Sequence, residues 1–380
     1  MKIINAQVFI NGSFRKTEVR FNDECILEIG SDLCDDEVID AEGNYLYPGL
    51  IDCHNHGGWF RSFMYEDNNQ YGSYEERIRF ILNKLPEHGV TTVMPTLAGT
   101  DYPRIARSVR ELRKLRNSFP GAHLDRFQFE GIYPSLQRYM TETAVNPSLE
   151  HTDYLVDKDY SDVLMIHVSP DLPGTAQWCD CMSEKGVLTA VGNTQANAED
   201  VLMAAEHGLS HPDHMFNGYR QMHHRENGAV AAVMYDDGIK AQLTCDGYHV
   251  SPLWVKILLK IKGLENVYGV TDMSEASGLQ DGTYEVNGKT IIASDGFIYD
   301  TDGYISSGNM TANEIMRAAR NRCGLSMETV ASLYCENVAD CLDIKDRGKI
   351  ETGRMSDFTL MDHDYNVLLT IINGKVYYQK

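Results

Sequence analysis

The sequence contains no run of about 18 apolar residues, so it has no candidate transmembrane helix. It also lacks an excess of basic residues, because 34 Lys and Arg stand against 55 Asp and Glu, for a formal net charge of −21. This acidic balance argues against a partner that is nucleic acid or an anionic membrane. The segment Met1–Asn5 is not a charged region followed by a long apolar stretch, so we expect no signal peptide.

No Cys-x-x-Cys pair is present, and the nine cysteines are irregularly spaced and odd in number. Such a set is typical of free thiols in a reducing compartment rather than of a disulfide framework. We therefore expect a cytoplasmic protein. With 43% hydrophobic and 23% charged residues, the composition is that of a globular chain, neither disordered nor fibrous.

Both ends of the chain have a strand-and-turn pattern. The first fifty residues hold short apolar segments separated by turns such as Asn11–Gly12, and the last thirty do the same around Asn373–Gly374. Each flank is too small to be stable alone. We expect them to pack together as one small β-sandwich domain, built from residues 1–48 and 346–380, which brings the two termini together.

Residues 49–345 alternate between strand-like and helix-like segments. The helical segments carry apolar residues at i, i+3, i+4 and i+7. Ser251 before Pro252, and Thr311 with Glu314, have the pattern of helix N-termini. Eight such units predict an α/β fold, a closed parallel (β/α)8 barrel of the TIM type. The eight expected strands are 50–54, 91–95, 127–130, 163–167, 188–191, 209–216, 241–246 and 267–272.

Side chains able to bind a metal follow most of these strands. They are His54 and His56, Glu130, His167, Asn193, His214, Asp246 with His249, and Asp272. The active sites of such barrels lie at the carboxyl ends of the strands. Two histidines at i and i+2 point to one face of a strand, so both imidazoles can reach one ion. A chance surface pair is the ordinary alternative for His54 and His56, and their place at the end of the first strand favours metal ligation.

The motif Pro-Gly-x-Ile-Asp-x-His-x-His-Gly at 48–57 resembles the amidohydrolase superfamily of barrel metallohydrolases. Further segments, in order over nearly the whole chain, are similar to its N-acetylglucosamine-6-phosphate deacetylase family, and His214–Asn217 and Asp246–Val250 are specific to that family. The resemblance implies a hydrolase that removes the acetyl group from an N-acetylated hexosamine 6-phosphate in amino-sugar catabolism. Family members are usually homodimers. The other similar segments are 89–96, 129–131, 224–228, 270–272 and 348–353.

The resemblance also implies a role for each candidate residue. The metal ligands would be His54, His56, Glu130, His214 and the residue at 193, holding one or two ions of Zn²⁺ or Fe²⁺, which accept nitrogen and oxygen donors. We prefer His214 to His211, because a spacing of three sends His211 to the opposite face of an extended chain.

Asp272 is expected to transfer the proton. A metal lowers the pKa of its bound water toward about 7, and a carboxylate beside it can take the proton and return it to the leaving amine. His249 is expected to orient or stabilise the amide oxygen of the substrate. The ordinary alternatives are a helix-capping aspartate for Asp272 and a rim carboxylate for Glu130.

Substrate contacts are expected from Asn217, Gly218, Arg225 and His249, which match family residues that hold the sugar phosphate and its amide. The forked guanidinium donors of arginine suit a phosphate, although a solvated surface arginine is the ordinary alternative. Ser307 lies in an expected turn that resembles, less closely, the segment that closes over the sugar.

Two departures from the family pattern stand out. Asn193 stands where the family commonly has histidine, and since an amide oxygen is a weaker donor, one of two metal positions is expected to bind poorly. Val145 stands where the family carries a histidine that touches substrate. We expect either a different sugar or acyl group, or a contact supplied from elsewhere, for example by Tyr133 or Arg138.

Two other functions stay open. One is a hydrolase or deaminase for a cyclic amide or a purine-like ring, which is weakened because Ile166–Val168 offers no lysine to bridge two metals. The other is a non-catalytic barrel that binds a sugar phosphate, against which the intact Asp272 counts. Tyr248 and Trp59 are expected either to form a hydrophobic wall of the site or to be packing residues.

Overall fold

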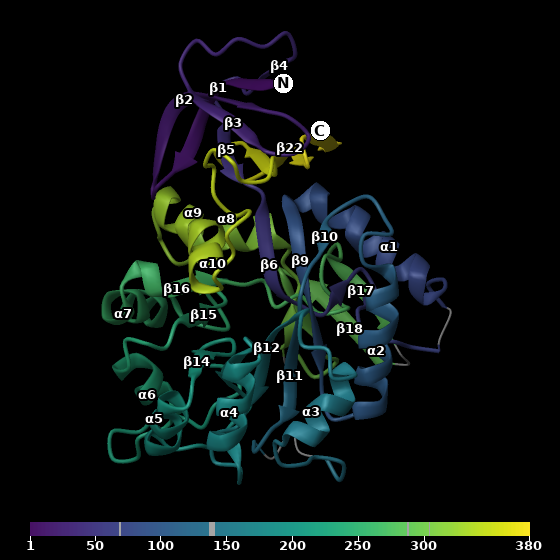
Figure 1. The fold of residues 1–380 in the computed structure, drawn as a ribbon, viewed down its shortest axis with the longest axis vertical. Coiled ribbons are helices and arrows are strands. Elements are labelled where there is room, and N and C mark those ends of the chain that lie inside the picture. Colours follow the sequence, from purple (N-terminus) through teal and green to yellow (C-terminus); the bar gives the residue numbers. More distant parts are fainter. Residues whose placement is uncertain (68–69, 137–140, 287–288, 304) are drawn as a thin grey trace.

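The computed structural model describes residues 1–67, 70–136, 141–286, 289–303 and 305–380. Figure 1 shows a small β-rich region, which contains both termini, above a larger barrel. The strands of the small region form one sheet with the order β23-β22-β21-β5-β1-β2-β3, and β4 pairs with β1. They are β1 (Lys2–Ile10), β2 (Ser13–Phe21), β3 (Ile26–Gly30), β4 (Val38–Asp40), β5 (Tyr45–Pro48), β21 (Phe358–Met361), β22 (Val367–Ile372) and β23 (Lys375–Gln379).

The Asn-Gly turns close two hairpins of this sheet. Asn11 and Gly12 have φ of 48° and 74°, and Asn373 and Gly374 have 47° and 68°. This left-handed pair matches the twist of antiparallel strands. The sheet encloses its own buried cluster, to which β1, β2, β3, β5, β21 and β22 contribute apolar side chains. The expected pairing of the two flanks is therefore found.

All eight predicted barrel strands are present. They are β6 (Leu50–Asn55), β9 (Val90–Ala98), β11 (Phe127–Tyr133), β12 (Val163–Val168), β13 (Leu188–Val191), β14 (Leu209–Pro212), β15 (Ala241–Leu243) and β16 (Val267–Gly269). β6, β9, β11, β12, β13 and β14 pair in parallel, as do β15 and β16. β14 is shorter than the expected strand, because the backbone turns after Pro212.

Backbone hydrogen bonds close the barrel on both sides of β15 and β16. Lys240 N–H donates to Ser210 O (2.8 Å), which joins β15 to β14. Asp272 N–H donates to His54 O (3.0 Å), which joins the end of β16 to β6. The sheet is therefore a closed (β/α)8 barrel, as predicted, and the short strands β7 (Gly57–Gly58), β8 (Arg61–Ser62) and β10 (His123–Leu124) are additions to it.

Helices surround the barrel in the order expected of βα units (Figure 1). The capping patterns at Ser251–Pro252 and Thr311–Glu314 do begin helices, the second with a complete capping box. The helices are α1 (Tyr74–Lys84), η1 (Leu85–His88), α2 (Tyr102–Leu115), α3 (Leu149–Val156), α4 (Thr175–Glu184), α5 (Ala198–Glu206), α6 (Ala229–Tyr235), α7 (Pro252–Lys262), η3 (Leu264–Asn266), α8 (Ala312–Asn321), α9 (Met327–Tyr334) and α10 (Glu336–Cys341).

A four-stranded antiparallel sheet between β16 and α8 was not expected. Its strands are β17 (Gly282–Val286), β18 (Lys289–Ser294), β19 (Phe297–Tyr299) and β20 (Ile305–Gly308). Ser307, expected in a turn, lies in strand β20 and pairs with Ile298. The turn prediction was wrong because the pairing partner comes from a hairpin outside the βα pattern.

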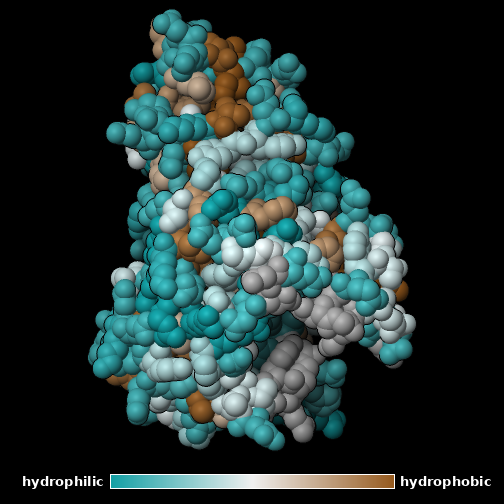
Figure 2. Space-filling model, turned by 90° about the vertical axis from the view of Figure 1, so that its right-hand side faces the viewer, coloured by the Kyte–Doolittle hydropathy of each residue, from teal (hydrophilic) through white to brown (hydrophobic). Residues whose placement is uncertain are grey.

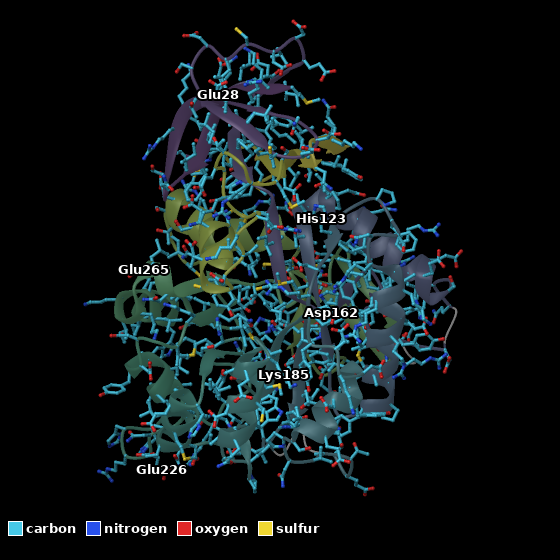
Figure 3. The ribbon with its side chains drawn as sticks, in the orientation of Figure 1. Glu28, His123, Asp162, Lys185, Glu226 and Glu265 are labelled. Atoms are coloured by element: carbon cyan, nitrogen blue, oxygen red, sulfur yellow. The ribbon has the colours of Figure 1, made fainter. Side chains whose placement is uncertain are left out.

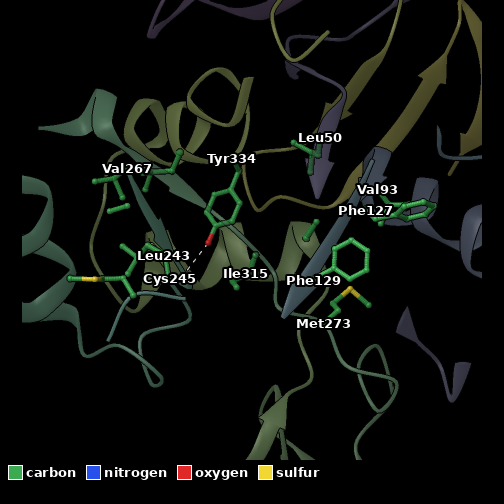
Figure 4. Close-up of a cluster of buried hydrophobic side chains, with 14 of the residues drawn as sticks. Leu50, Val93, Phe127, Phe129, Leu243, Cys245, Val267, Met273, Ile315 and Tyr334 are labelled. Atoms are coloured by element: carbon green, nitrogen blue, oxygen red, sulfur yellow. Dashed lines mark hydrogen bonds between the residues drawn. The ribbon is translucent and has the colours of Figure 1, made fainter. Parts of the chain in front are cut away.

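The barrel core is continuous from the strands to the helices. Figure 4 shows part of this core, in which the Tyr334 hydroxyl of α9 accepts the Cys245 N–H at 3.4 Å. The outer surface in Figure 2 is mostly hydrophilic, with its largest hydrophobic group over the small β-rich region at the top of the view. Within the described residues, every helix is too short or too polar to cross a bilayer.

Candidate active site

Four donor atoms from residues at the ends of three barrel strands converge at the mouth of the barrel. Nε2 of His54 lies 3.2 Å from Nε2 of His56. Oε2 of Glu130 lies 3.5 Å and 3.0 Å from these two nitrogens. Oδ1 of Asp272 lies 3.4 Å and 3.5 Å from them. The sequence placed these residues at the carboxyl ends of β6, β11 and β16, and barrel closure brings the four atoms to one point.

The second oxygen of Glu130 faces a different set of side chains. Oε1 lies 3.0 Å from Nε2 of His214 and accepts a hydrogen bond from Nδ2 of Asn193 at 3.2 Å. Glu130 therefore stands between two groups of donors, one with His54 and His56 and one with His214. A carboxylate in this position can bridge two cations.

Two buried acceptors fix which nitrogen each histidine presents. Nδ1 of His54 lies 2.8 Å from Oε1 of Gln242, which also accepts the backbone N–H of His214. Nδ1 of His214 lies 3.0 Å from the carbonyl of Asn217. An acceptor at Nδ1 holds the proton there and turns the lone pair of Nε2 toward the cluster, which is the usual arrangement of a metal-binding histidine.

The electrostatic field of the cluster favours a cation. Burial lowers the pKa values of His54, His56 and His214, but the surrounding carboxylates exceed this effect and raise them to about 9, 10 and 10. Burial raises the pKa of Asp272, but the neighbouring imidazoles outweigh it and hold that pKa at about 2. These carboxylates are therefore anionic, and they attract positive charge to the point where the histidines meet.

The donor set fits a transition metal. With metal–ligand distances of about 2.0–2.1 Å, the corners of a tetrahedron are about 3.3–3.4 Å apart. This is close to the 3.0–3.5 Å between the two histidine nitrogens and from each of them to Oε2 of Glu130 and Oδ1 of Asp272. Mixed imidazole and carboxylate donors suit Zn²⁺ or Fe²⁺.

Asp272 and Asn193 have φ of 52° and 49°, and this left-handed backbone is tolerated by Asp and Asn.

His249 lies beside the cluster, in the segment after β15. Its Nδ1 is 2.5 Å from Oδ2 of Asp246. A small cavity is lined by Asp246, His249, Thr271 and Asp272. The Asp272 side chain is 34% exposed, more than those of the other three residues that surround the point of convergence. Asp272 and His249 are thus the two side chains best placed to meet a molecule entering the barrel mouth.

The expected substrate residues are placed at different depths. Asn217 and Gly218 border the cluster, because a Cβ at 218 would lie 2.8 Å from Oδ1 of Asn193. Ser307 is half-buried, and its hydroxyl lies 3.1 Å from that of Ser274. Arg225 is exposed in the loop 220–228. The labelled neighbour Glu226 places this loop at the end of the barrel away from the small β-rich region (Figure 3), the end toward which the barrel strands run.

Several alternative residues face elsewhere. His211 points away from the cluster, since its Nε2 contacts the carbonyl of Cys341 at 3.2 Å, and burial lowers its pKa to about 4. Tyr133 is buried with its hydroxyl 2.9 Å from His151 and Thr152, so it cannot replace a substrate contact. Arg138 lies outside the described residues.

Trp59 and Tyr248, the two aromatic residues considered for a wall of the site, have different surroundings. Trp59 is buried, stacks on His88 with ring centroids 5.4 Å apart, and lines a separate cavity of about 770 Å³. None of the described residues of the histidine–carboxylate cluster lines that cavity. Tyr248 is 61% exposed and packs on Phe297. Trp59 is therefore a packing residue rather than a wall of the cluster.

Sequence reasoning missed one member of the cluster and left another without a role. Asp213 is fully buried, with Oδ2 at 3.1 Å from Nε2 of His214 and 2.9 Å from Nδ1 of His167. Strict alternation along a strand puts Asp213 and His214 on opposite faces, but β14 ends at Pro212 and the turn directs both inward. His167 was noted as a polar strand end, and its contact with Asp213 could not be inferred from spacing.

Histidines and carboxylates that converge at the carboxyl end of a closed (β/α)8 barrel define a metal-dependent barrel hydrolase. The model of the amidohydrolase family matches residues 45–377, which shows that the chain belongs to that family. The family is metal-dependent and hydrolyses amide bonds.

Two curated relatives align with this chain over most of their length. The chain is 27% identical over 352 residues to the N-acetylglucosamine-6-phosphate deacetylase of Bacillus subtilis (strain 168), covering 90% of this chain and 86% of that protein. It is 25% identical over 404 residues to the deacetylase of the same name from Caenorhabditis elegans, covering 99% and 94%.

Solved structures share the fold. The deacetylase from Pasteurella multocida superposes with a TM-score of 0.88 at 24% identity, over 99% of this chain and 98% of that one. A variant from Mycobacterium smegmatis, solved in complex with N-acetyl-D-glucosamine-6-phosphate, has a TM-score of 0.87 at 22% identity, over 100% and 99%.

Proposed function

We propose that the protein is a metal-dependent deacetylase of N-acetylated hexosamine 6-phosphates, with N-acetylglucosamine 6-phosphate as the first candidate substrate and amino-sugar catabolism as its role. The observation that carries this proposal is the convergence of His54, His56, Glu130 and Asp272 at 3.0–3.5 Å in the barrel mouth. The substrate class is supported by the curated relatives, which match about nine-tenths of the chain.

The metal would be Zn²⁺ or Fe²⁺, held by His54, His56, Glu130 and Asp272. When bound, such an ion supplies an activated water and polarises the carbonyl of the substrate. His214 lies on the other side of Glu130, where a second ion would be held, and Asn193 offers only an amide there. The amide is a weaker ligand than the imidazole that the family commonly has at this place.

Asp272 is the proposed proton carrier. Because its pKa lies near 2, it is ionised at neutral pH and can accept a proton from the attacking water. It then delivers that proton to the nitrogen of the departing amino sugar. Its side chain is 34% exposed, which leaves it accessible to a molecule in the barrel mouth.

His249 is proposed to hold the amide oxygen of the substrate. Asp246 fixes Nδ1, so Nε2 is the nitrogen left for the substrate. A protonated Nε2 donates a hydrogen bond to the oxygen as negative charge develops on it, which is the effect that lowers barriers in acyl transfer.

The phosphate would be bound by Arg225, with Asn217, Gly218 and Ser307 around the sugar. The loop that carries Arg225 is attached at both ends to the segment after β13, through the bridges Thr194–Tyr219 and Asn197–Gly228. A loop anchored in this way can hold an arginine over the barrel mouth while leaving its guanidinium free for a dianionic ligand.

Three further properties belong to the same proposal. We propose a small β-sandwich domain of residues 1–48 and 346–380 and a barrel domain of residues 49–345. The division is supported by the strands of both ends, which pair with one another and enclose one buried cluster. A cytoplasmic location is supported by nine free cysteines. A homodimer is proposed because family members are usually homodimers. The net charge of −21 favours neither nucleic acid nor a membrane as a partner.

The test is acetate release from a panel of N-acetylhexosamines with and without the 6-phosphate. The protein is stripped of metal and reconstituted separately with Zn²⁺, Fe²⁺ and Mn²⁺. Turnover of a phosphorylated sugar is expected to fall by at least about 100-fold in Asp272→Asn and to persist in Asp237→Asn, a control at an exposed aspartate. If the metal-loaded protein cleaves no member of the panel, the deacetylase proposal is wrong.

A further inference from the structure

Asp213 is a buried carboxylate with no hydrogen bond to either oxygen. It is 0% exposed, and both Oδ1 and Oδ2 lack a hydrogen-bond partner in the described structure. The nearest groups to Oδ2 are Nδ1 of His167 at 2.9 Å and Nε2 of His214 at 3.1 Å. A buried carboxylate among imidazoles is stabilised only where a positive charge lies beside it. Oδ1 faces His54 Nδ1 at 3.3 Å, but that nitrogen already meets Gln242 at the shorter distance of 2.8 Å. A cation beside Asp213 would balance the negative charge of this buried carboxylate.

The surroundings of Asp213 hold it in place. Its backbone N–H donates to Val191 O at 2.8 Å, and its carbonyl accepts the hydroxyl of Tyr219 at 2.7 Å. Residue 192 is glycine, and a Cβ there would come within 2.7 Å of Cβ of Asp213. The main chain on both sides thus leaves a space that the aspartate side chain fills, directed at Glu130 and His214.

Glu130, Asp213 and His214 present one ligand atom each, and all three atoms lie within 4.8 Å of one another. Nε2 of His214 is 3.0 Å from Oε1 of Glu130 and 3.1 Å from Oδ2 of Asp213. With Nδ1 of His214 facing the Asn217 carbonyl, Nε2 is the nitrogen directed at the two carboxylates. A proton on Nε2 satisfies these contacts, and a divalent cation between the three atoms can take the place of that proton.

Asn193 adds a second unpartnered group at the same point. Its Oδ1 is buried without a hydrogen bond, while its Nδ2 donates to Oε1 of Glu130. The amide can contribute an oxygen after rotation about its side-chain torsion. It cannot supply the negative charge that a divalent ion requires, whereas Asp213 can.

We infer that the chain has a second divalent-metal position, held by Glu130, Asp213 and His214, in which the Asp213 carboxylate supplies the donor that Asn193 supplies only weakly. Glu130 would serve both positions, since Oε2 faces His54 and His56 and Oε1 faces His214. The inference deepens the proposed function at the same site, and it differs from the expectation that this position binds poorly. Oxygen-rich donors of this kind suit Zn²⁺, Fe²⁺ or Mn²⁺.

The experiment counts metal ions in the full-length protein after reconstitution with Zn²⁺ and removal of excess ion. Wild type is expected to hold two ions per chain and Asp213→Asn one. Adding Asn193→His to Asp213→Asn is expected to restore the second ion, because an imidazole then occupies the position of the weak amide. Asp162→Asn is the matched control. It alters a buried aspartate paired with Arg113, away from the cluster, and should keep two ions.

Anomalous diffraction from wild-type crystals grown with Zn²⁺ decides the question even if Asp213→Asn does not fold. A peak at bonding distance from Oε1 of Glu130, Asp213 and His214 supports the inference. A single ion in the wild type, or two ions retained in Asp213→Asn, overturns it. These readouts do not use acetate release, so a failure of the deacetylase proposal leaves them interpretable.

Discussion

Oδ2 of Asp246 lies 2.5 Å from Nδ1 of His249, and Oδ1 of the same carboxylate accepts the backbone N–H groups of Tyr248 and His249. One side chain thus fixes both the loop and the ring. Burial lowers the pKa of His249, but the carboxylates of Asp246 and Asp272 outweigh it and raise that pKa. His249 therefore keeps its proton to higher pH than an ordinary histidine.

The Asp246→Asn variant is expected to lose this advantage. Without the carboxylate the pKa of His249 falls, so the protonated ring is lost at lower pH and the basic limb of the kcat/KM profile moves in the acid direction. We expect kcat/KM at neutral pH to fall by roughly 10- to 100-fold. The control is His249→Gln, in which this limb should vanish. An unmoved limb in Asp246→Asn would rule out His249 as the proton-bearing donor.

Arg225→Ala is expected to weaken binding of the phosphorylated substrate while leaving the chemical step alone. KM should rise about 10- to 100-fold with kcat nearly unchanged, the pattern of a lost contact that is equal in the ground and transition states. Arg220→Ala is the comparison within the same loop, because the guanidinium of Arg220 is paired with Glu226. An equal loss toward a sugar without phosphate would argue against a phosphate contact.

Removal of the metal is expected to destabilise the fold. A ligand that binds only the native state adds about 4 kcal/mol at a thousand times its dissociation constant. For a chain of this length, we expect chelation to lower the thermal midpoint by on the order of 5–10 °C. Calorimetry before and after chelation, with Zn²⁺ added back, measures the difference. A midpoint that chelation does not change would contradict a cation in the cluster.

The cysteines are expected to differ widely in reactivity. Burial raises the pKa of Cys179 to about 12 and that of Cys323 to about 11, so both thiols stay protonated at neutral pH. Cys34 is exposed. A colorimetric thiol reagent should therefore modify Cys34 rapidly in the native protein and all nine thiols after denaturation. Fewer than nine in unreduced, denatured protein would reveal a disulfide.

The periodic part of the fold could be predicted from the sequence, because each barrel strand is a short apolar segment between two amphipathic helices. The His54–His56 pair is visible for the same reason, since alternation along a strand fixes the face of both rings. The sheet β17–β20 escaped this reasoning. It is a local hairpin insertion, and its strands contribute few residues to the barrel core.

Asp213 shows where sequence reasoning stops at the site itself. Its position depends on a turn after Pro212, on the missing side chain at Gly192 and on the hydroxyl of Tyr219, none of which has a sequence period. A carboxylate next to a histidine in the chain is common. The proposed role of Asp213 in metal binding depends on Glu130, which is more than eighty residues away in the sequence. The two come together only in the closed barrel.

Strand β5 pairs with β1 on one side and with β21 on the other. During synthesis the N-terminal strands therefore leave the ribosome with one edge of their sheet open, and the edge is covered only after Phe358–Met361 have been made. At about 5–20 residues per second, this interval lasts roughly 15–60 s. An open edge invites pairing with other chains, so we expect a chain that ends before β21 to aggregate more readily than the full-length chain.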